Sequence, residues 1–89
     1  LYLEVFKARG YSSKGKLFYK QRMFDLSDSL GFKAINILKP MEFKKHKPIR
    51  IRALKVYSST LLWFGFSHYI RGKYDEALLH YDEVNRITL

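Results

Sequence analysis

Cysteine is absent from this chain of 89 residues, and proline occurs only twice. Without cysteine the protein has no disulfide framework, no thiolate metal ligand and no cysteine nucleophile. This composition fits a reducing compartment, so we expect an intracellular, cytoplasmic protein. At this length we expect one small domain, residues 1–89, and the 47% of hydrophobic residues supply enough side chains for a core.

Acidic residues are also scarce. Eight Asp and Glu stand against 17 Lys and Arg, which gives a formal net charge of +9. The excess lies in residues 1–57, which hold 14 of the basic residues and four acids, whereas residues 58–89 are nearly neutral. Such asymmetry favours an anionic partner, either nucleic acid, an acidic protein surface or an anionic membrane. The alternative is a basic surface that only keeps the protein soluble.

The sequence has no apolar run long enough to span a membrane and no catalytic or metal-binding motif. Residues 56–70 carry no formal charge, but a membrane span needs about 20 apolar residues. Among the three histidines there is no HExxH motif, and His68 and His80 alone are too few for a metal site. We therefore expect no membrane span, no metal, no cofactor and no enzymatic activity.

What the sequence does contain is a helix–turn–helix pattern in its last third. Gly72 suits the left-handed residue that ends a helix, and Asp75 and Glu76 fall in the first turn of the next helix, where the helix dipole favours negative charge. Apolar residues then recur every three or four positions, at Tyr74, Ala77, Leu78, Tyr81, Val84 and Ile87. This spacing predicts an antiparallel pair of helices.

The same residues resemble the tetratricopeptide repeat, a helix–turn–helix unit of 34 residues. Residues 58–89 carry the resemblance through Phe64-Gly65, His68 at an aromatic position, the turn pair Gly72 and Tyr74, the small residue Ala77, and the aromatic Tyr81. Two positions depart from the family pattern, because Val84 replaces a second small residue and the terminal proline is missing.

Residues 1–32 look like a second, degenerate copy when they are laid over the last hairpin with a shift of 57 residues. In that overlay Ala8 falls on Gly65, Gly15 on Gly72 and Phe24 on Tyr81, with Lys20 on Ala77 as a departure. Between the two copies, residues 33–57 are expected to complete a long helix and a basic loop. We thus predict an all-α domain of stacked helical hairpins, with four helices at about 1–12, 17–38, 49–70 and 74–87, and a possible kink at Gly31. Because helical repeats come in groups, we also expect part of a larger chain or assembly.

The resemblance implies a protein-interaction scaffold in which the first helix of each repeat lines a groove. It places the partner-binding positions at Ser59, Leu62, Phe66, Tyr69 and Ile70, with Val5 and Arg9 in the weaker copy. Family members that clamp a peptide carboxylate use basic residues or Asn there, and only Arg9 qualifies. The expected partner is therefore a protein or peptide that binds an apolar groove.

The basic segment 39–55 supports an alternative, nucleic-acid binding. It contains one acid, Glu42, and Phe43 and His46 interleave the cations Lys39, Lys44, Lys45, Lys47, Arg50, Arg52 and Lys55. Clustered cations bind phosphates by releasing counterions, and an exposed aromatic ring can stack on a base. An acidic protein would satisfy the same charges. The salt dependence of the affinity separates nucleic-acid binding from binding in an apolar groove, since phosphate contacts weaken steeply with salt and apolar contacts do not.

Overall fold

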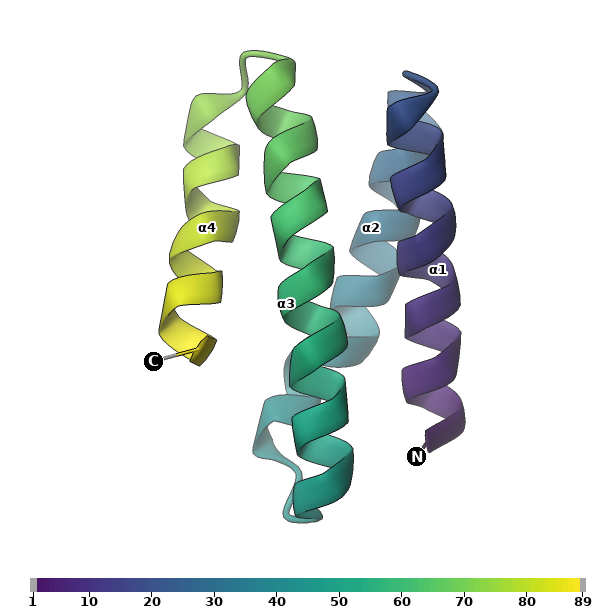
Figure 1. The fold of residues 1–89 in the computed structure, drawn as a ribbon, viewed down its shortest axis with the longest axis vertical. Coiled ribbons are helices and arrows are strands. Elements are labelled where there is room, and N and C mark those ends of the chain that lie inside the picture. The colour runs from purple at the N-terminus through teal and green to yellow at the C-terminus, as the bar shows by residue number, and fades with distance from the viewer. Residues whose placement is uncertain (1, 89) are drawn as a thin grey trace.

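The computed structural model describes residues 2–88, which form four α-helices and one short 3₁₀-helix (Figure 1). The helices are α1 (Tyr2–Lys20), α2 (Phe24–Leu38), α3 (Lys47–Ile70) and α4 (Tyr74–Thr88), and the 3₁₀-helix η1 (Lys39–Phe43) follows α2 directly. The predicted all-α class with four helices is confirmed. We call α1 with α2 hairpin 1, and α3 with α4 hairpin 2.

The two hairpins stack so that α3 occupies the centre of the molecule. Figure 1 shows α1 beside α3, α2 behind them, and α4 on the far side of α3. Backbone contacts agree, since α3 touches α1, α2, η1 and α4, whereas α4 touches α3 alone among these elements. The result is a thin slab of 38 × 25 × 14 Å.

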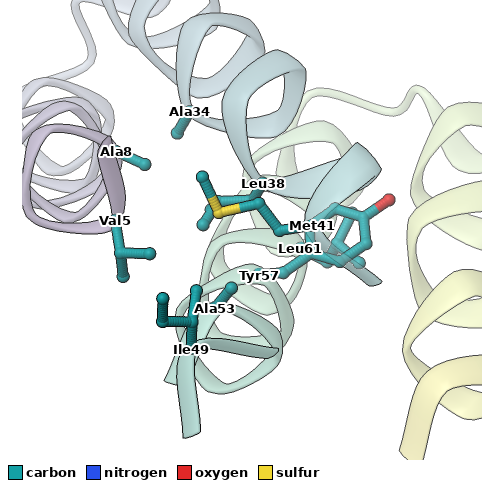
Figure 2. Packing of buried hydrophobic residues seen from close by; sticks show 9 residues of the cluster. All are labelled: Val5, Ala8, Ala34, Leu38, Met41, Ile49, Ala53, Tyr57 and Leu61. Atoms are coloured by element: carbon teal, nitrogen blue, oxygen red, sulfur yellow. The ribbon is translucent and has the colours of Figure 1, made fainter. Parts of the chain in front are cut away.

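The hydrophobic core lies where α3 meets hairpin 1 and η1. Ala8 of α1 and Ala34 of α2 leave room there for the larger side chains of Met41, Tyr57 and Leu61 (Figure 2). The cluster consists of Val5, Ala8, Ala34, Leu38, Met41, Ile49, Ala53, Tyr57 and Leu61. Tyr57 also points its hydroxyl toward α4, so this side chain joins the core to the outer helix of hairpin 2 (Figure 2).

The predicted end of the first helix at residue 12 and the start of the second at 17 are wrong. Helix α1 runs unbroken to Lys20, and its turn falls at residues 21–23. Tertiary packing explains the error. Ser12 is buried and accepts a hydrogen bond of 2.9 Å from Trp63 Nε1, and Gly15 lies directly beneath the Trp63 ring. Both residues serve a helix–helix contact rather than a turn.

The other predicted helices agree with the structure more closely. Helices expected at 49–70 and 74–87 are found as α3 and α4, with ends that differ by no more than two residues. Gly72 adopts φ +76°, the left-handed conformation that ends a helix. Helix α2 passes through Gly31 without the kink that the sequence allowed, and the missing side chain there makes space for Phe64.

The backbone turns of the two hairpins match at a shift of 50 residues, not 57. Met23 N donates to Phe18 O at 2.9 Å, and Lys73 N donates to His68 O at the same distance. Arg22 has φ +61° where Gly72 has φ +76°. The true equivalents of Gly65, His68 and Ala77 are therefore Gly15, Phe18 and Ser27.

Candidate interaction surface

Charge is divided between the helices in a way that the linear sequence hides. The adjacent helices α1 and α3 carry nine Lys and Arg against one acid, Glu4. Helices α2 and α4 carry two basic residues, Lys33 and Arg86, against six acids. The positive charge of the protein is thus concentrated on the layer formed by α1 and α3.

Ion pairs within residues 2–88 leave this basic layer free. Arg71, in the turn of hairpin 2, binds Asp28 at 2.7 Å, and Arg86 of α4 binds Glu42 at 2.9 Å and Glu83 at 2.6 Å. None of the nine basic residues of α1 and α3 takes part in an ion pair in this part of the chain. Their charges remain available to a partner.

An open groove of about 610 Å³ runs between α1 and α3. Stacked rings of Tyr19 and Trp63, 5.9 Å apart, join the two helices there. The remaining lining residues combine two lysines with polar and apolar side chains of α3, namely Lys16, Lys55, Ser58, Ser59 and Leu62. The groove therefore offers both an apolar contact and positive charge.

The predicted partner-binding positions on α3 lie on an exposed surface. Ser59 and Leu62 line the groove, and Leu62 is 50% exposed. Phe66 continues the surface, with its ring edge-on to Tyr19 at 6.4 Å, and Tyr69 stacks on Phe66 at 6.1 Å. Ile70 is exposed at the end of the helix. These five side chains follow one strip along α3.

The predicted positions on α1 need one correction. Val5 is only 1% exposed and belongs to the core, so it cannot contact a partner, whereas Arg9 is exposed. A shift of 50 residues instead makes Lys16 and Tyr19 the equivalents of Phe66 and Tyr69. Sequence reasoning missed both, and the signal that could have found them was Gly15 read as the counterpart of Gly65.

The basic segment 39–55 does not form one cluster. Lys47, Arg52 and Lys55 share one side of α3 and line a depression of about 490 Å³, together with Pro48 and Ile51. Arg52 lies over the Tyr2 ring of α1, 5.7 Å from its centroid. Because Lys55 borders both depressions, the basic patch continues into the groove.

The other predicted cations point elsewhere. Arg50 lies two residues from Arg52, and so on another side of the helix, and its Nη1 donates to the carbonyl of Lys44 at 3.0 Å. Lys44 and Lys45 are exposed before α3 begins. Lys39 lies in η1 near Glu83, where its charge helps to lower the pKa of that carboxyl.

A network of charged and phenolic groups ties η1, α3 and α4 together. Tyr57 donates to Glu83 Oε2 at 2.8 Å, and Arg86 binds Glu83 and Glu42. The hydrogen bond from Arg86, with help from Tyr57, lowers the pKa of Glu83 to about 2. Burial and the neighbouring Glu83 raise the pKa of Tyr57. Each group is matched by a partner, so the network is structural.

The two histidines of hairpin 2 lie close together where α3 packs against α4. Burial lowers the pKa of His80, whose ring lies 5.1 Å from that of His68. His68 is buried, with Nδ1 2.8 Å from the Phe64 carbonyl oxygen, so it fills a packing position. Across residues 2–88 no group of three or more His, Asp or Glu side chains is arranged to hold a metal ion. Within the same residues, no helix has the length and apolar character needed to cross a membrane.

No family model, curated protein or solved structure matches this chain. A proposal for its function therefore depends on the surface of α1 and α3.

Proposed function

We propose that the protein is a non-enzymatic interaction scaffold that binds a protein or peptide partner in the groove between α1 and α3. The resemblance of residues 58–89 to a tetratricopeptide repeat supports this assignment. The observation that carries it is the strip of exposed apolar side chains on α3, which borders Lys16 and Lys55 in an open groove. Large exposed apolar patches rimmed by polar residues are typical of interaction sites.

The composition of the groove defines the partner that it fits. Leu62 and Phe66 supply apolar anchors, and burying such area contributes about 25 cal/mol per Å². Lys16 and Lys55 attract negative charge, which speeds association and orients the partner more than it adds affinity. The expected ligand is a segment with one or two large apolar side chains flanked by Asp or Glu.

A selection from a displayed library of random peptides tests this function. We expect enrichment of acidic peptides with apolar anchors, and a loss of affinity of about tenfold or more for the variant Leu62→Ala/Phe66→Ala, as for anchors at other interfaces. The matched control is Leu79→Ala/Phe32→Ala, which removes two exposed apolar side chains from α4 and α2. Peptides that bind both variants equally well would contradict the groove as the site.

Nucleic-acid binding remains a second candidate, because Lys47, Arg52 and Lys55 share one side of α3 with no acid among them. We expect the triple Ala variant to remove RNA or DNA binding, and wild-type affinity to fall steeply between about 50 and 200 mM salt. Lys44→Ala/Lys45→Ala is the control, since it removes two cations outside this patch. Fluorescence anisotropy with labelled oligonucleotides measures both effects, and the absence of binding at low salt excludes this candidate.

A further inference from the structure

The junction between the two hairpins shows how this fold accepts an additional helix. Four residues of hairpin 1, which we call the receiving residues, form contacts with hairpin 2. Tyr19 stacks on Trp63, Gly31 lies under Phe64, Phe24 packs below the Arg71 guanidinium at 4.6 Å, and Asp28 binds Arg71 at 2.7 Å. They come from both helices of hairpin 1, so the incoming helix α3 lies against the pair.

Hairpin 2 presents the equivalent edge without a cover. Moving the four receiving residues by 50 positions leads to Tyr69, Tyr74, Leu78 and Tyr81. Tyr74 is 63% exposed and Leu78 58% exposed, and the rings of Tyr69 and Tyr74 meet at 5.5 Å. This edge is more apolar than its counterpart, because Leu78 and Tyr81 replace Asp28 and Gly31.

The opposite end of the molecule presents the equivalent of the incoming helix. The residues of α3 that enter the junction, Thr60, Trp63, Phe64 and Ser67, correspond to Gly10, Ser13, Lys14 and Leu17 of α1. This side of α1 faces away from its buried residues Val5, Ala8, Ser12 and Gly15. Leu3 and Leu17 are exposed on it, and no heavy atom lies within 4 Å of the position that a Cβ would take at Gly10.

The two free ends are complementary in size and in charge. In the internal junction Gly15 and Gly31 of hairpin 1 face the large rings of Trp63 and Phe64 on α3. At the free ends the sizes are reversed, because large side chains lie on the edge formed by α3 and α4, and the small residues Gly10 and Ser13 lie on α1. Helix α1 carries five basic residues against Glu4, and α4 carries four acids against Arg86. Asp75 and Asp82 are exposed and form no ion pair within residues 2–88.

We infer that a second copy of this chain docks its α1 onto the α3–α4 edge, so that copies stack head to tail. Lys14 corresponds to Phe64, whose ring lies against Gly31 and Phe32 of α2 in the internal junction. The same shift turns Gly31 and Phe32 into Tyr81 and Asp82, so in the stacked pair Lys14 lies beside Asp82 on the acidic α4 of the neighbour. Because the two contacting surfaces differ, the contact does not close on itself and each added copy leaves a free end.

Analytical ultracentrifugation over a range of protein concentrations at low salt tests the inference. We expect the weight-average mass to rise with concentration beyond that of a dimer. Lys14→Glu and Asp82→Lys should each be monomeric, because like charges then meet at the contact. A mixture of the two variants should assemble again, since every contact then joins opposite charges.

The control variant Lys44→Glu makes the same change in net charge as Lys14→Glu but lies outside both ends, and it should assemble like the wild type. Circular dichroism verifies that each variant is folded. A wild type that stays monomeric up to millimolar concentration overturns the inference. So does a mass that levels off at the dimer, which indicates a symmetric contact, or a mixture of the two charge variants that fails to assemble.

Discussion

Hairpin 1 turns at Arg22 and hairpin 2 at Gly72, and the same backbone hydrogen bonds close both turns at a shift of 50 residues. Their packing roles nevertheless differ. Hairpin 1 contributes small buried residues to the interior, Ser12, Gly15, Ser27 and Gly31, while hairpin 2 contributes Tyr57, Trp63 and Phe64. The two hairpins thus share a backbone conformation, but hairpin 1 has small residues where hairpin 2 has large ones. This difference in side-chain size determines how the two hairpins stack.

Adding bulk to the receiving hairpin should have the largest effect on stability. A Cβ at Gly15 would lie 2.7 Å from the Trp63 ring. Gly15→Val should therefore lower the free energy of unfolding by about 3 kcal/mol, the upper range for overpacked cores. Urea denaturation followed by Trp63 fluorescence measures this loss.

Gly10→Ala is the matched control in the same helix. Nothing lies within 4 Å of its Cβ position, so the substitution should raise stability by about 0.5–1 kcal/mol through helix propensity alone. If both glycine substitutions change the free energy of unfolding by the same amount, the packing of hairpin 2 on hairpin 1 does not depend on the close approach of Trp63 to Gly15.

Gly15 also shows why the sequence predicted hairpin 2 better than hairpin 1. A glycine that ends a helix and a glycine that admits a distant ring look alike in sequence, and Trp63 is far from Gly15 along the chain. The overlay at 57 was in error by seven residues, which is about two helical turns. It therefore kept most residues on the correct face of the helix while it moved the turn.

The candidate site was predictable to a similar extent. The positions on α3 were those that the resemblance to a tetratricopeptide repeat implied, and they lie on one exposed strip because that hairpin was correctly placed. Its other wall, Lys16 and Tyr19, depended on the position of the first turn and was missed. The separation of Arg50 from Arg52 and Lys55 followed from their spacing in the predicted helix and was missed, whereas the side on which Lys47 lies required the true start of α3.

Breaking the ion pair that joins the hairpins should have the next largest effect. Arg71 donates two hydrogen bonds to Asp28, at 3.0 and 2.7 Å, and a third contact ties it to the Ser67 carbonyl at 3.2 Å. Arg71→Ala should cost about 2 kcal/mol, as expected for charged hydrogen bonds that are largely shielded from water.

A double-mutant cycle with Asp28→Ala isolates the pair, and thermal unfolding supplies the four free energies. Arg71→Lys keeps the charge but loses the planar fork, so it should recover less than half of the loss. Full recovery by lysine would mean that charge alone, rather than paired geometry, orients one hairpin on the other.

The network around Glu83 makes the stability of hairpin 2 depend on pH. Its pKa falls from the usual 4.5 to about 2 in the folded protein. A lowered pKa means that the ionised form stabilises the fold above pH 4.5, and that this contribution is lost as the pH falls toward about 2. Glu83→Gln should therefore be less stable at neutral pH and should lose less stability on acidification.

Tyr57→Phe, which removes one hydrogen bond to Glu83, should cost about 1 kcal/mol at neutral pH. Asp82→Asn removes a neighbouring charge that lies outside the network, and should keep the acid sensitivity of the wild type. Urea unfolding at a series of pH values separates these variants. An acid profile of Glu83→Gln that parallels the wild type would assign the sensitivity to another carboxyl group.

The smallest expected effect concerns the left-handed residue of each turn. Arg22 holds the left-handed conformation at φ +61°, which costs a residue with a side chain roughly 1 kcal/mol, whereas Gly72 adopts φ +76° without this cost. Arg22→Gly should therefore raise stability by about 0.5 kcal/mol, since the greater freedom of glycine in the unfolded chain offsets part of the gain.

Gly72→Ala completes the comparison between the two turns. No heavy atom lies within 4 Å of its Cβ position, so its expected cost of about 1 kcal/mol is due to the backbone alone. The two substitutions should thus have opposite signs when unfolding free energies are measured under the same conditions. If Arg22→Gly is destabilising instead, contacts of the Arg22 side chain must stabilise the fold by more than its left-handed backbone conformation costs. The turn of hairpin 1 would then be held by contacts that hairpin 2 lacks.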